Sequence, residues 1–359
     1  MTSGTSDPAR TANVIGLGLI GGSIALGLRQ RGWSVHGDDA SPTIATRALD
    51  GGIIDATGVA TDATITFVAV PVSAIVGQVR RALIETTGTV TDVGSVKAPV
   101  CEVCADPRFV GGHPMAGSEL DGLDGADGEM FNGAIWLLTP TADSDDHTLA
   151  NVSGVVRELG ADVVALTPDK HDQVVAVVSH VPHLAAATLM KLASDRADEH
   201  AALLRLAAGG FRDMTRIASG HPDIWLDICA ENRSAIVTAL GGLIDRLSEI
   251  RDVVDVADRD GLQSLLVAAR DARTNLPGRV AHPETFAEVR IPIPDRTGAA
   301  AEVFTLAADL GVNISNFEVV HMAEGNRGVA VVLVDAASSE VFRGGLIARG
   351  FKPAVSPLV

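Results

Sequence analysis

The stretch "VIGLGLIGGS", residues 14 to 23, decides the fold. It places Gly16, Gly18 and Gly21 in G-x-G-x-x-G spacing, directly after an apolar run that reads as a strand and at the start of an expected helix. Glycines at these positions allow a tight turn and let a pyrophosphate approach the helix N-terminus, where free N–H groups favour negative charge. The stretch therefore predicts a dinucleotide-binding domain, against the alternative of a glycine-rich turn without a ligand.

The next expected strand, "WSVHG", ends just before Asp38 and Asp39. An acidic residue at this distance receives the ribose hydroxyls of a dinucleotide, and we favour Asp39 for that role. Ala40 follows where an arginine would neutralise a 2′-phosphate, so NAD is preferred over NADP. The expected cofactor-binding residues are Gly16, Gly18, Leu19, Ile20, Gly21, Asp39, Val70, Pro71 and Ser95.

The periodicity of apolar residues changes twice along the chain. Residues 1–168 alternate short β-branched runs with helical stretches, the rhythm of a doubly wound parallel sheet of the Rossmann type. Residues 169–275 show helical spacing almost throughout, and residues 276–284 read as a linker. Residues 285–359 show the order βαββαβ, which predicts a small ferredoxin-like domain.

Composition excludes several classes of partner. The formal net charge of −17 opposes binding to nucleic acid and to anionic membrane surfaces. The first residues lack the charged segment and long apolar stretch of a signal peptide, and no apolar run reaches the length that a membrane span needs, so we expect the chain in the cytoplasm. Cys101 and Cys104 lack a second pair of zinc ligands, so they read as small core residues and no metal is expected.

Two further segments carry polar side chains at the carboxyl edge of the predicted sheet. "TDVGSVK" offers the hydroxyl of Ser95 and Lys97, one of only four lysines in the chain, although Ser95 alone would read as a helix cap. "GGHPMAGSE" places His113 in what reads as a rigid Gly-Pro loop after the next strand. Because ligands of open α/β sheets bind at this edge, we expect both segments to face one crevice.

The helical half adds a second set of candidates. His180 and His183 lie close together, but their spacing across a proline and the poor supply of carboxylates argue against a metal site. Arg212 and Arg216 lie one turn apart on an expected helix, so both guanidinium groups share a face. Such a face is either solvated surface or a means of capturing carboxylates.

These segments together resemble the prephenate/arogenate dehydrogenase family. "GLGLIGGS", "DVGSVK", "GGHPMAGSE", "HDQVVAVVSHVPH" and "GGFRDMTRIA" occur in the order that this family shows, over about residues 12 to 275. The C-terminal segment looks like an ACT domain, the amino-acid-sensing module that some members carry. The resemblance implies NAD-dependent oxidative decarboxylation of prephenate to 4-hydroxyphenylpyruvate, a step of tyrosine biosynthesis.

The resemblance also implies residue roles. His113 would accept the proton of the ring hydroxyl, with Ser95 bridging the hydroxyl, the imidazole and the nicotinamide. Arg216 would anchor a substrate carboxylate, with Asp213 as its orienting ion-pair partner. The remaining expected substrate-binding residues are His183, Asp172, Lys97, Arg212, Glu119 at the entrance, and Trp225 supplied by a neighbouring subunit.

Several alternatives stay open at this stage. The chain could oxidise arogenate, which differs from prephenate by an ammonium group in place of a keto group, or it could be a catalytically silent amino-acid sensor. A β-hydroxy-acid dehydrogenase would need a catalytic lysine in a context that Lys170 and Lys191 lack. We expect a homodimer through the apolar helical segment and tyrosine as an effector of the C-terminal domain, near Gly311 to Asn313.

Overall fold

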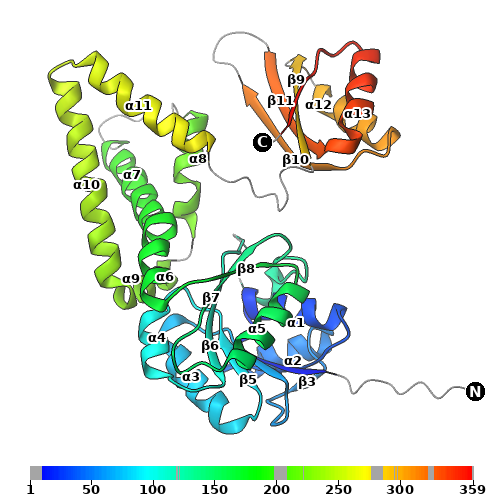
Figure 1. Cartoon of the computed structure of the whole chain (residues 1–359), viewed down its shortest axis with the longest axis vertical. Coiled ribbons are helices and arrows are strands. Elements are labelled where there is room, and N and C mark those ends of the chain that lie inside the picture. Colours follow the sequence, from blue (N-terminus) through cyan, green and yellow to red (C-terminus); the bar gives the residue numbers. More distant parts are fainter. Residues whose placement is uncertain are drawn as a thin grey trace, which may run out of the picture. The chain divides into compact units, whose positions relative to one another are not determined.

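The computed structural model describes residues 10–118, 120, 122–197, 208–220, 222–275, 286–294, 296, 298–321 and 327–357. The chain divides into two compact units, residues 1–269 and 270–359 (Figure 1). The expected linker at residues 276–284 and the expected gate Glu119 lie outside the described residues.

The first unit begins with an eight-stranded sheet in the order β3-β2-β1-β4-β5-β6-β7-β8. Its strands are β1 Thr11–Ile15, β2 Ser34–Asp38, β3 Ala56–Thr57, β4 Ile65–Val68, β5 Thr89–Asp92, β6 Phe109–Pro114, β7 Ile135–Thr139 and β8 Asp162–Ala165. Its helices are α1 Leu19–Gln30, α2 Pro42–Asp50, α3 Val72–Glu85, α4 Ala98–Val103, the 3-10 turn Leu123–Gly125 and α5 Asp146–Glu158. The predicted Rossmann-like sheet is confirmed.

Apolar side chains bury both faces of this sheet. Val14 belongs to one core with α1, α2 and α5, whereas Ile15 belongs to a second core with α3 and α4. Successive side chains of a strand point to opposite faces, so neighbouring apolar residues in β1 serve both cores. This explains why the strands read as continuous β-branched runs.

One strand pair departs from the all-parallel sheet that we predicted. β7 runs antiparallel to β6, with His113 opposite Leu137. The segment between these two strands contains only a 3-10 turn and no crossover helix among its described residues. A parallel connection requires such a crossover, so the chain instead returns in the opposite direction.

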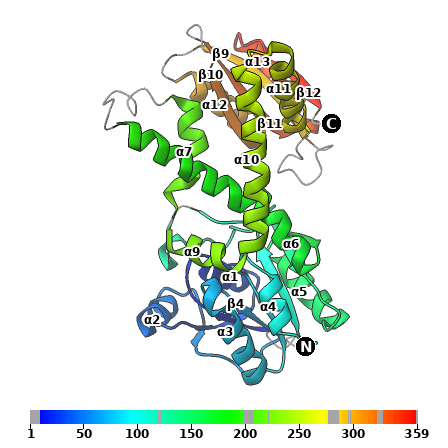
Figure 2. The ribbon, with the colours of Figure 1, turned by 90° about the vertical axis from the view of Figure 1, so that its left-hand side faces the viewer.

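The rest of the first unit is helical, as predicted, and its last helix, α11, continues past residue 269. It comprises α6 Pro168–Val175, a π-helical turn Ala176–His180, α7 Val181–Ala197, α8 Gly209–Thr215, a 3-10 turn Arg216–Ser219, α9 Pro222–Glu231, α10 Arg233–Asp255 and α11 Arg259–Thr274. α10 contacts the π-helical turn, and Figure 2 shows α7 and α10 diverging from that point. A small core around Ala176, Ile228 and Ile236 joins α9 and α10 to this turn.

The continuous helix Pro168–Arg196 corrects one expectation from the sequence. By length and hydropathy alone it could cross a membrane, although a core helix of a soluble protein passes the same test. It carries the buried polar side chains of His171, Asp172 and His180, which contact other parts of the same unit. These contacts join the helix to the rest of the first unit, and 33% of its apolar window is buried.

The second unit is a four-stranded antiparallel sheet in the order β10-β11-β9-β12. Its elements are β9 Phe286–Pro294, α12 Ala299–Asp309, β10 Ile314–His321, β11 Arg327–Asp335, α13 Ala336–Ala348 and β12 Ala354–Pro357. Alternate residues of β9 are buried against the core that α12 and α13 share. The predicted βαββαβ order is confirmed, and the assignment to the ACT family remains a prediction.

Candidate active site

The glycine-rich turn after β1 leaves room for a phosphate beside the start of α1. Gly16 has a φ of +94°, and a Cβ there would lie 2.3 Å from the carbonyl oxygen of Ala69. A Cβ on Gly21 would lie 1.8 Å from the carbonyl oxygen of Gly16, so Gly21 lets α1 approach the turn. A Cβ on Gly18 would meet no protein atom within 4 Å. Gly18 precedes α1, whose N-terminus has no side-chain cap, so backbone N–H groups remain for an anion.

The carboxylate of Asp39 is hydrogen-bonded to the backbone of the same glycine-rich turn. Its Oδ2 accepts a hydrogen bond from the backbone N–H of Leu17 at 2.8 Å, and its Oδ1 accepts one from Ser41 at 2.8 Å. Asp38 forms an ion pair with Arg81 at 2.7 Å instead. This arrangement supports the choice of Asp39 as the ribose-binding acid. Val70 and Pro71 follow β4 at the neighbouring strand end.

His113 lies in strand β6, which corrects our expectation that a Gly-Pro loop holds it. The two glycines that precede His113 allow neighbouring atoms to pack directly against the backbone of β6. A Cβ on Gly111 would lie 2.5 Å from Oγ1 of Thr139, and one on Gly112 would lie 2.7 Å from the carbonyl oxygen of Asp92. The sheet therefore fixes the backbone that carries the imidazole. Cys101 packs beside Thr139 and is 4% exposed, which confirms that it is a core residue, and this burial raises the pKa of its thiol to about 11.

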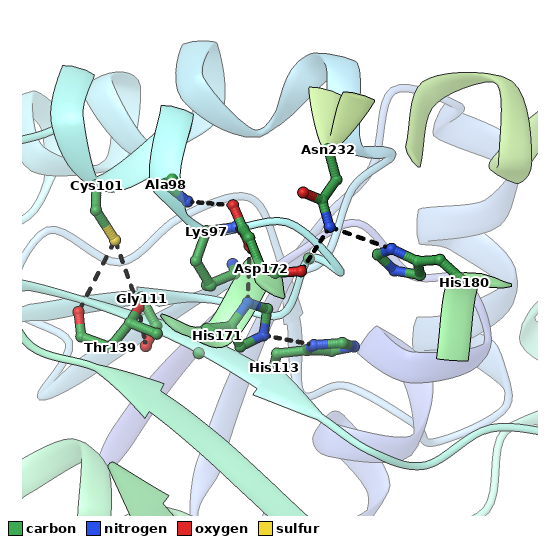
Figure 3. Close-up of polar contacts among 12 residues, drawn as sticks. Lys97, Ala98, Cys101, Gly111, His113, Thr139, His171, Asp172, His180 and Asn232 are labelled. Atoms are coloured by element: carbon green, nitrogen blue, oxygen red, sulfur yellow. Dashed lines mark hydrogen bonds and ion pairs between the residues drawn. The ribbon is translucent and has the colours of Figure 1, made fainter. Parts of the chain in front are cut away.

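A chain of hydrogen bonds connects His113 to a buried carboxylate (Figure 3). Nδ1 of His113 lies 2.8 Å from Nε2 of His171, and Nδ1 of His171 lies 2.8 Å from Oδ1 of Asp172. A carboxylate oxygen only accepts, so His171 donates from Nδ1 and its Nε2 accepts from His113. Nε2 of His113 consequently carries a lone pair. His113 is 8% exposed, so its side chain is almost fully buried.

Burial keeps both imidazoles of this chain neutral. Desolvation is the main cause that lowers the pKa of His113 well below its usual value, and the nearby His171, Lys97 and His180 lower it further. Desolvation also lowers the pKa of His171, against the opposing effect of its hydrogen bond to Asp172. A neutral imidazole is the form that accepts a proton, so His113 is ready to act as a base.

Lys97 and Asp172 are bound by other groups of the protein, and their expected contact with the substrate stays a prediction. Lys97 is fully buried and forms an ion pair with Asp92. Asp92 also accepts hydrogen bonds from the N–H groups of Gly94 and Gly112, so it joins the Ser95 loop to strand β6. Asp172 accepts from the N–H groups of Lys97 and Ala98 at 2.8 and 2.9 Å, as well as from His171. The ammonium group of Lys97 and the carboxylate of Asp172 therefore already have partners within the protein.

His183 stacks on Trp225, with ring centroids 3.6 Å apart and planes 14° apart. Gly220 borders both rings, since a Cβ there would lie 3.6 Å from Cε1 of His183 and 3.8 Å from Nε1 of Trp225. Trp225 thus lies against its own chain, whereas the resemblance implied a residue from a neighbouring subunit. The reason is that α9 packs on the core at the π-helical turn and brings Trp225 over α7.

The remaining candidate site residues are Ser95, Arg212, Arg216 and Asp213. Ser95 is half-buried in the loop before α4, and its hydroxyl forms no hydrogen bond with the described part of the protein. Arg212 and Arg216 are exposed, on α8 and on the 3-10 turn that packs against α7. Asp213 is exposed and forms no ion pair with Arg216 within the described contacts, so its expected orienting role is not seen.

Sequence reasoning missed His171 and Asn232, and it considered His180 only as a metal ligand. His171, His180 and Asn232 are buried at 0%, 1% and 4% exposure. Nδ2 of Asn232 donates to the carbonyl oxygen of Asp172 at 2.9 Å and lies 3.2 Å from Nδ1 of His180. The available signal was the pair His171-Asp172 near the start of an apolar helix, because buried polar side chains need partners.

Comparison with known proteins shows to which family the chain belongs. Residues 24–166 match the nucleotide-binding domain of prephenate dehydrogenase, and residues 167–268 match its dimerization domain. The "Prephenate dehydrogenase" of Bacillus subtilis (strain 168) is 34% identical over 89% of this chain and 90% of its own length. The chain belongs to the prephenate dehydrogenase family.

Two solved structures of related dehydrogenases agree with the fold. Prephenate dehydrogenase from A. aeolicus, in complex with hydroxyphenyl propionate and NAD+, is 29% identical with a TM-score of 0.70, over 76% of this chain and 100% of that one. Synechocystis arogenate dehydrogenase is 30% identical with a TM-score of 0.65, over 73% of this chain and 98% of that one. The family matches end at residue 268, so they leave the second unit unassigned.

Proposed function

We propose that this chain is an NAD-dependent prephenate dehydrogenase that converts prephenate to 4-hydroxyphenylpyruvate. One observation carries the proposal. His113 presents a neutral Nε2 lone pair from the end of a strand of the dinucleotide-binding sheet, with Asp172 and His171 fixing its tautomer. The names of the Bacillus and A. aeolicus relatives support prephenate as the substrate.

The residues around the glycine-rich turn fit NAD. The open position at Gly18 and the uncapped start of α1 suit the pyrophosphate, with Leu19 and Ile20 beginning the helix there. Asp39 would receive the ribose hydroxyls, while Val70 and Pro71 would border the cofactor at the next strand end. When bound, NAD⁺ supplies a hydride acceptor for the ring carbinol carbon.

The mechanism then follows from the fixed tautomers. Nε2 of His113 accepts the proton of the ring hydroxyl as the carbon–hydrogen bond breaks, and Asp172 stabilises the resulting positive charge through His171. The carbinol carbon becomes a carbonyl carbon. The electrons of the bond to the ring carboxylate then complete the aromatic ring as CO₂ leaves, and the former carbonyl oxygen takes the proton back from His113. Ser95, with a hydroxyl uncommitted among the described residues, would donate to the reacting oxygen.

Substrate binding is assigned to the helical side of the site. Arg216 would hold a carboxylate of the substrate, and Arg212 would add positive potential in an otherwise acidic protein. The stacked pair His183 and Trp225 would form one wall of the ring pocket. A charged clamp suits the side-chain carboxylate best, since tight binding of the ring carboxylate would oppose its departure.

Assembly and regulation extend the proposal. α10 exposes an apolar stripe that includes Val237, Ile244, Leu247 and Val254, each more than half exposed. Together with the match to a dimerization domain, this stripe supports a homodimer. Tyrosine as an effector of the second unit and a cytoplasmic location remain predictions from the sequence.

Arogenate is the second candidate substrate, favoured by the structural similarity to the Synechocystis enzyme. NADH formation measured in parallel with prephenate and arogenate, each with NAD⁺ and NADP⁺, tests the proposal. Fastest turnover with prephenate and NAD⁺ supports it. Turnover of arogenate alone would reassign the substrate, and cofactor binding without any turnover would indicate a catalytically silent sensor.

A further inference from the structure

His180 carries a hydrogen-bond donor that has no partner in the described part of the chain. Its side chain is 1% exposed, and Nε2 is a buried nitrogen without a partner among the described residues. Buried polar atoms are nearly always paired, because an unmade hydrogen bond in the interior is costly. The nitrogen therefore needs an acceptor that the described residues do not provide.

The neighbouring amide settles which nitrogen of His180 bears the proton. Nδ2 of Asn232 donates to the carbonyl oxygen of Asp172, so the nitrogen end of this amide must face that oxygen. The same nitrogen lies 3.2 Å from Nδ1 of His180, which therefore accepts. The proton of the neutral ring is consequently on Nε2. Burial lowers the pKa of His180 to about 4, so the ring stays neutral at physiological pH.

The π-helical turn brings His180 to the active-site side of its helix. Eight residues of regular α-helix would rotate His180 about 80° away from Asp172. The wider turn Ala176–His180 reduces this rotation, and Asn232 bridges both residues. Such π-turns occur frequently at functional sites.

His180 also lies close to the residues that would surround a substrate. Figure 3 shows its ring towards the end of the His113 ring that does not contact His171, and His180 contributes to lowering the pKa of His113. Its ring meets Trp225 edge-on, with centroids 6.1 Å apart. The unpaired Nε2–H thus belongs to the region between the base and the aromatic wall.

We propose that Nε2–H of His180 donates a hydrogen bond to an oxygen of the bound substrate, as a substrate-contacting residue of the same site. The inference rests on the proposed dehydrogenase function. The acceptor is either the ring hydroxyl or the ring carboxylate, both oxygens of the cyclohexadienol. A neutral donor orients such an oxygen without the strong ground-state attraction of a cation, which suits a carboxylate that must depart.

The test compares His180→Phe, which keeps a ring and removes the donor, with His180→Gln, whose amide reaches about where Nε2 lies. His147→Phe, at an exposed position on α5, serves as the matched control. For each protein we would measure kcat/KM with prephenate and, separately, the dissociation constants of 4-hydroxyphenylpyruvate and of NADH.

We expect His180→Phe to lower kcat/KM about 10- to 100-fold, as for a lost hydrogen bond to a polar or charged acceptor, with NADH affinity unchanged and partial recovery in His180→Gln. Weaker binding of 4-hydroxyphenylpyruvate as well identifies the hydroxyl, which this product retains. Unchanged binding of the product identifies the ring carboxylate, which it lacks. Wild-type kcat/KM in folded His180→Phe, or a loss confined to NADH binding, would overturn the inference.

A measurement that leaves His180 itself unchanged guards against a His180 variant that fails to fold. With ¹⁵N-labelled histidine, we expect the Nε2–H resonance of His180 to shift when prephenate is added to a turnover-deficient His113→Asn protein. No shift on binding would overturn the inference. Absence of turnover in the wild-type protein would instead count against the proposed function, so the two failures are distinguishable.

Discussion

Nδ1 of His113 lies 2.8 Å from Nε2 of His171, and this contact determines which nitrogen of His113 can act as a base. His171 accepts at Nε2 because its Nδ1–H is directed to Asp172. The lone pair of His113 is thereby fixed on Nε2. The arrangement is comparable in principle to other histidine bases that a carboxylate orients, here with a second imidazole between the two.

Replacement of His171 by Phe tests this orienting role. The variant keeps a buried ring but leaves Nδ1–H of His113 without an acceptor, so the productive tautomer loses its support. We expect kcat to fall about 10- to 10³-fold, with a smaller change in KM. This fall in kcat is smaller than the one that follows replacement of the orienting carboxylate in a Ser-His-Asp triad. His147→Phe again provides the control, and a His171→Phe enzyme with wild-type kcat would refute the role.

Arg216→Ala probes the carboxylate anchor. An anchor binds the ground state and the transition state alike, so its loss is expected mainly to raise KM for prephenate, about 10- to 100-fold. Arg212→Ala, on the same helical segment, is expected to have a smaller effect. Steady-state kinetics give KM for prephenate in both variants. An unchanged KM in Arg216→Ala would exclude Arg216 as the carboxylate anchor.

The dependence of kcat/KM on pH follows from the lowered pKa of His113. Its ordinary value is 6.5, and burial followed by His171 and Lys97 holds it well below that. The base is active when neutral, which is above its pKa. We therefore expect no loss of activity from protonation of His113 as the pH falls to 6.5, and a decline only at lower pH. A loss of half the rate at or above pH 6.5 that is assigned to this residue would contradict the geometry.

The two glycines of the turn predict different responses to alanine. In Gly21→Ala the new Cβ would meet the carbonyl oxygen of Gly16, so α1 must shift, and we expect a loss of about 1–3 kcal/mol of unfolding free energy together with weaker NAD⁺ binding. Gly18→Ala meets no protein atom within 4 Å, so its stability should stay unchanged while NAD⁺ binding weakens. Thermal unfolding and NAD⁺ titration check both, and equal losses of stability would be inconsistent with this structure.

Periodicity and turn chemistry were sufficient to predict the three regions of the fold. The run before Gly16, the helical spacing after Pro168 and the βαββαβ order of the second unit all appear as expected. Such local signals do not specify strand direction. The antiparallel β7 therefore escaped prediction, and with it the position of His113 within a strand.

The candidate site was predictable only where residue type alone reveals chemistry. His113 and the glycines were identified in this way. Asp172 was assigned to the substrate from the family resemblance and Lys97 for its positive charge, whereas in the structure Lys97 is buried in an ion pair with Asp92 and Asp172 accepts from backbone N–H groups. His180 and Asn232 depend on a π-helical turn and on a contact between residues 52 positions apart, which no local pattern encodes.

The most direct test of the account is the rate of NADH formation when His113→Asn and the wild-type protein are each mixed with NAD⁺ and prephenate. We predict rapid NADH formation by the wild type and a turnover about 10²- to 10⁴-fold lower in the variant, with the affinity for prephenate largely retained. Full activity in His113→Asn would contradict the central claim that this imidazole takes the proton of the ring hydroxyl.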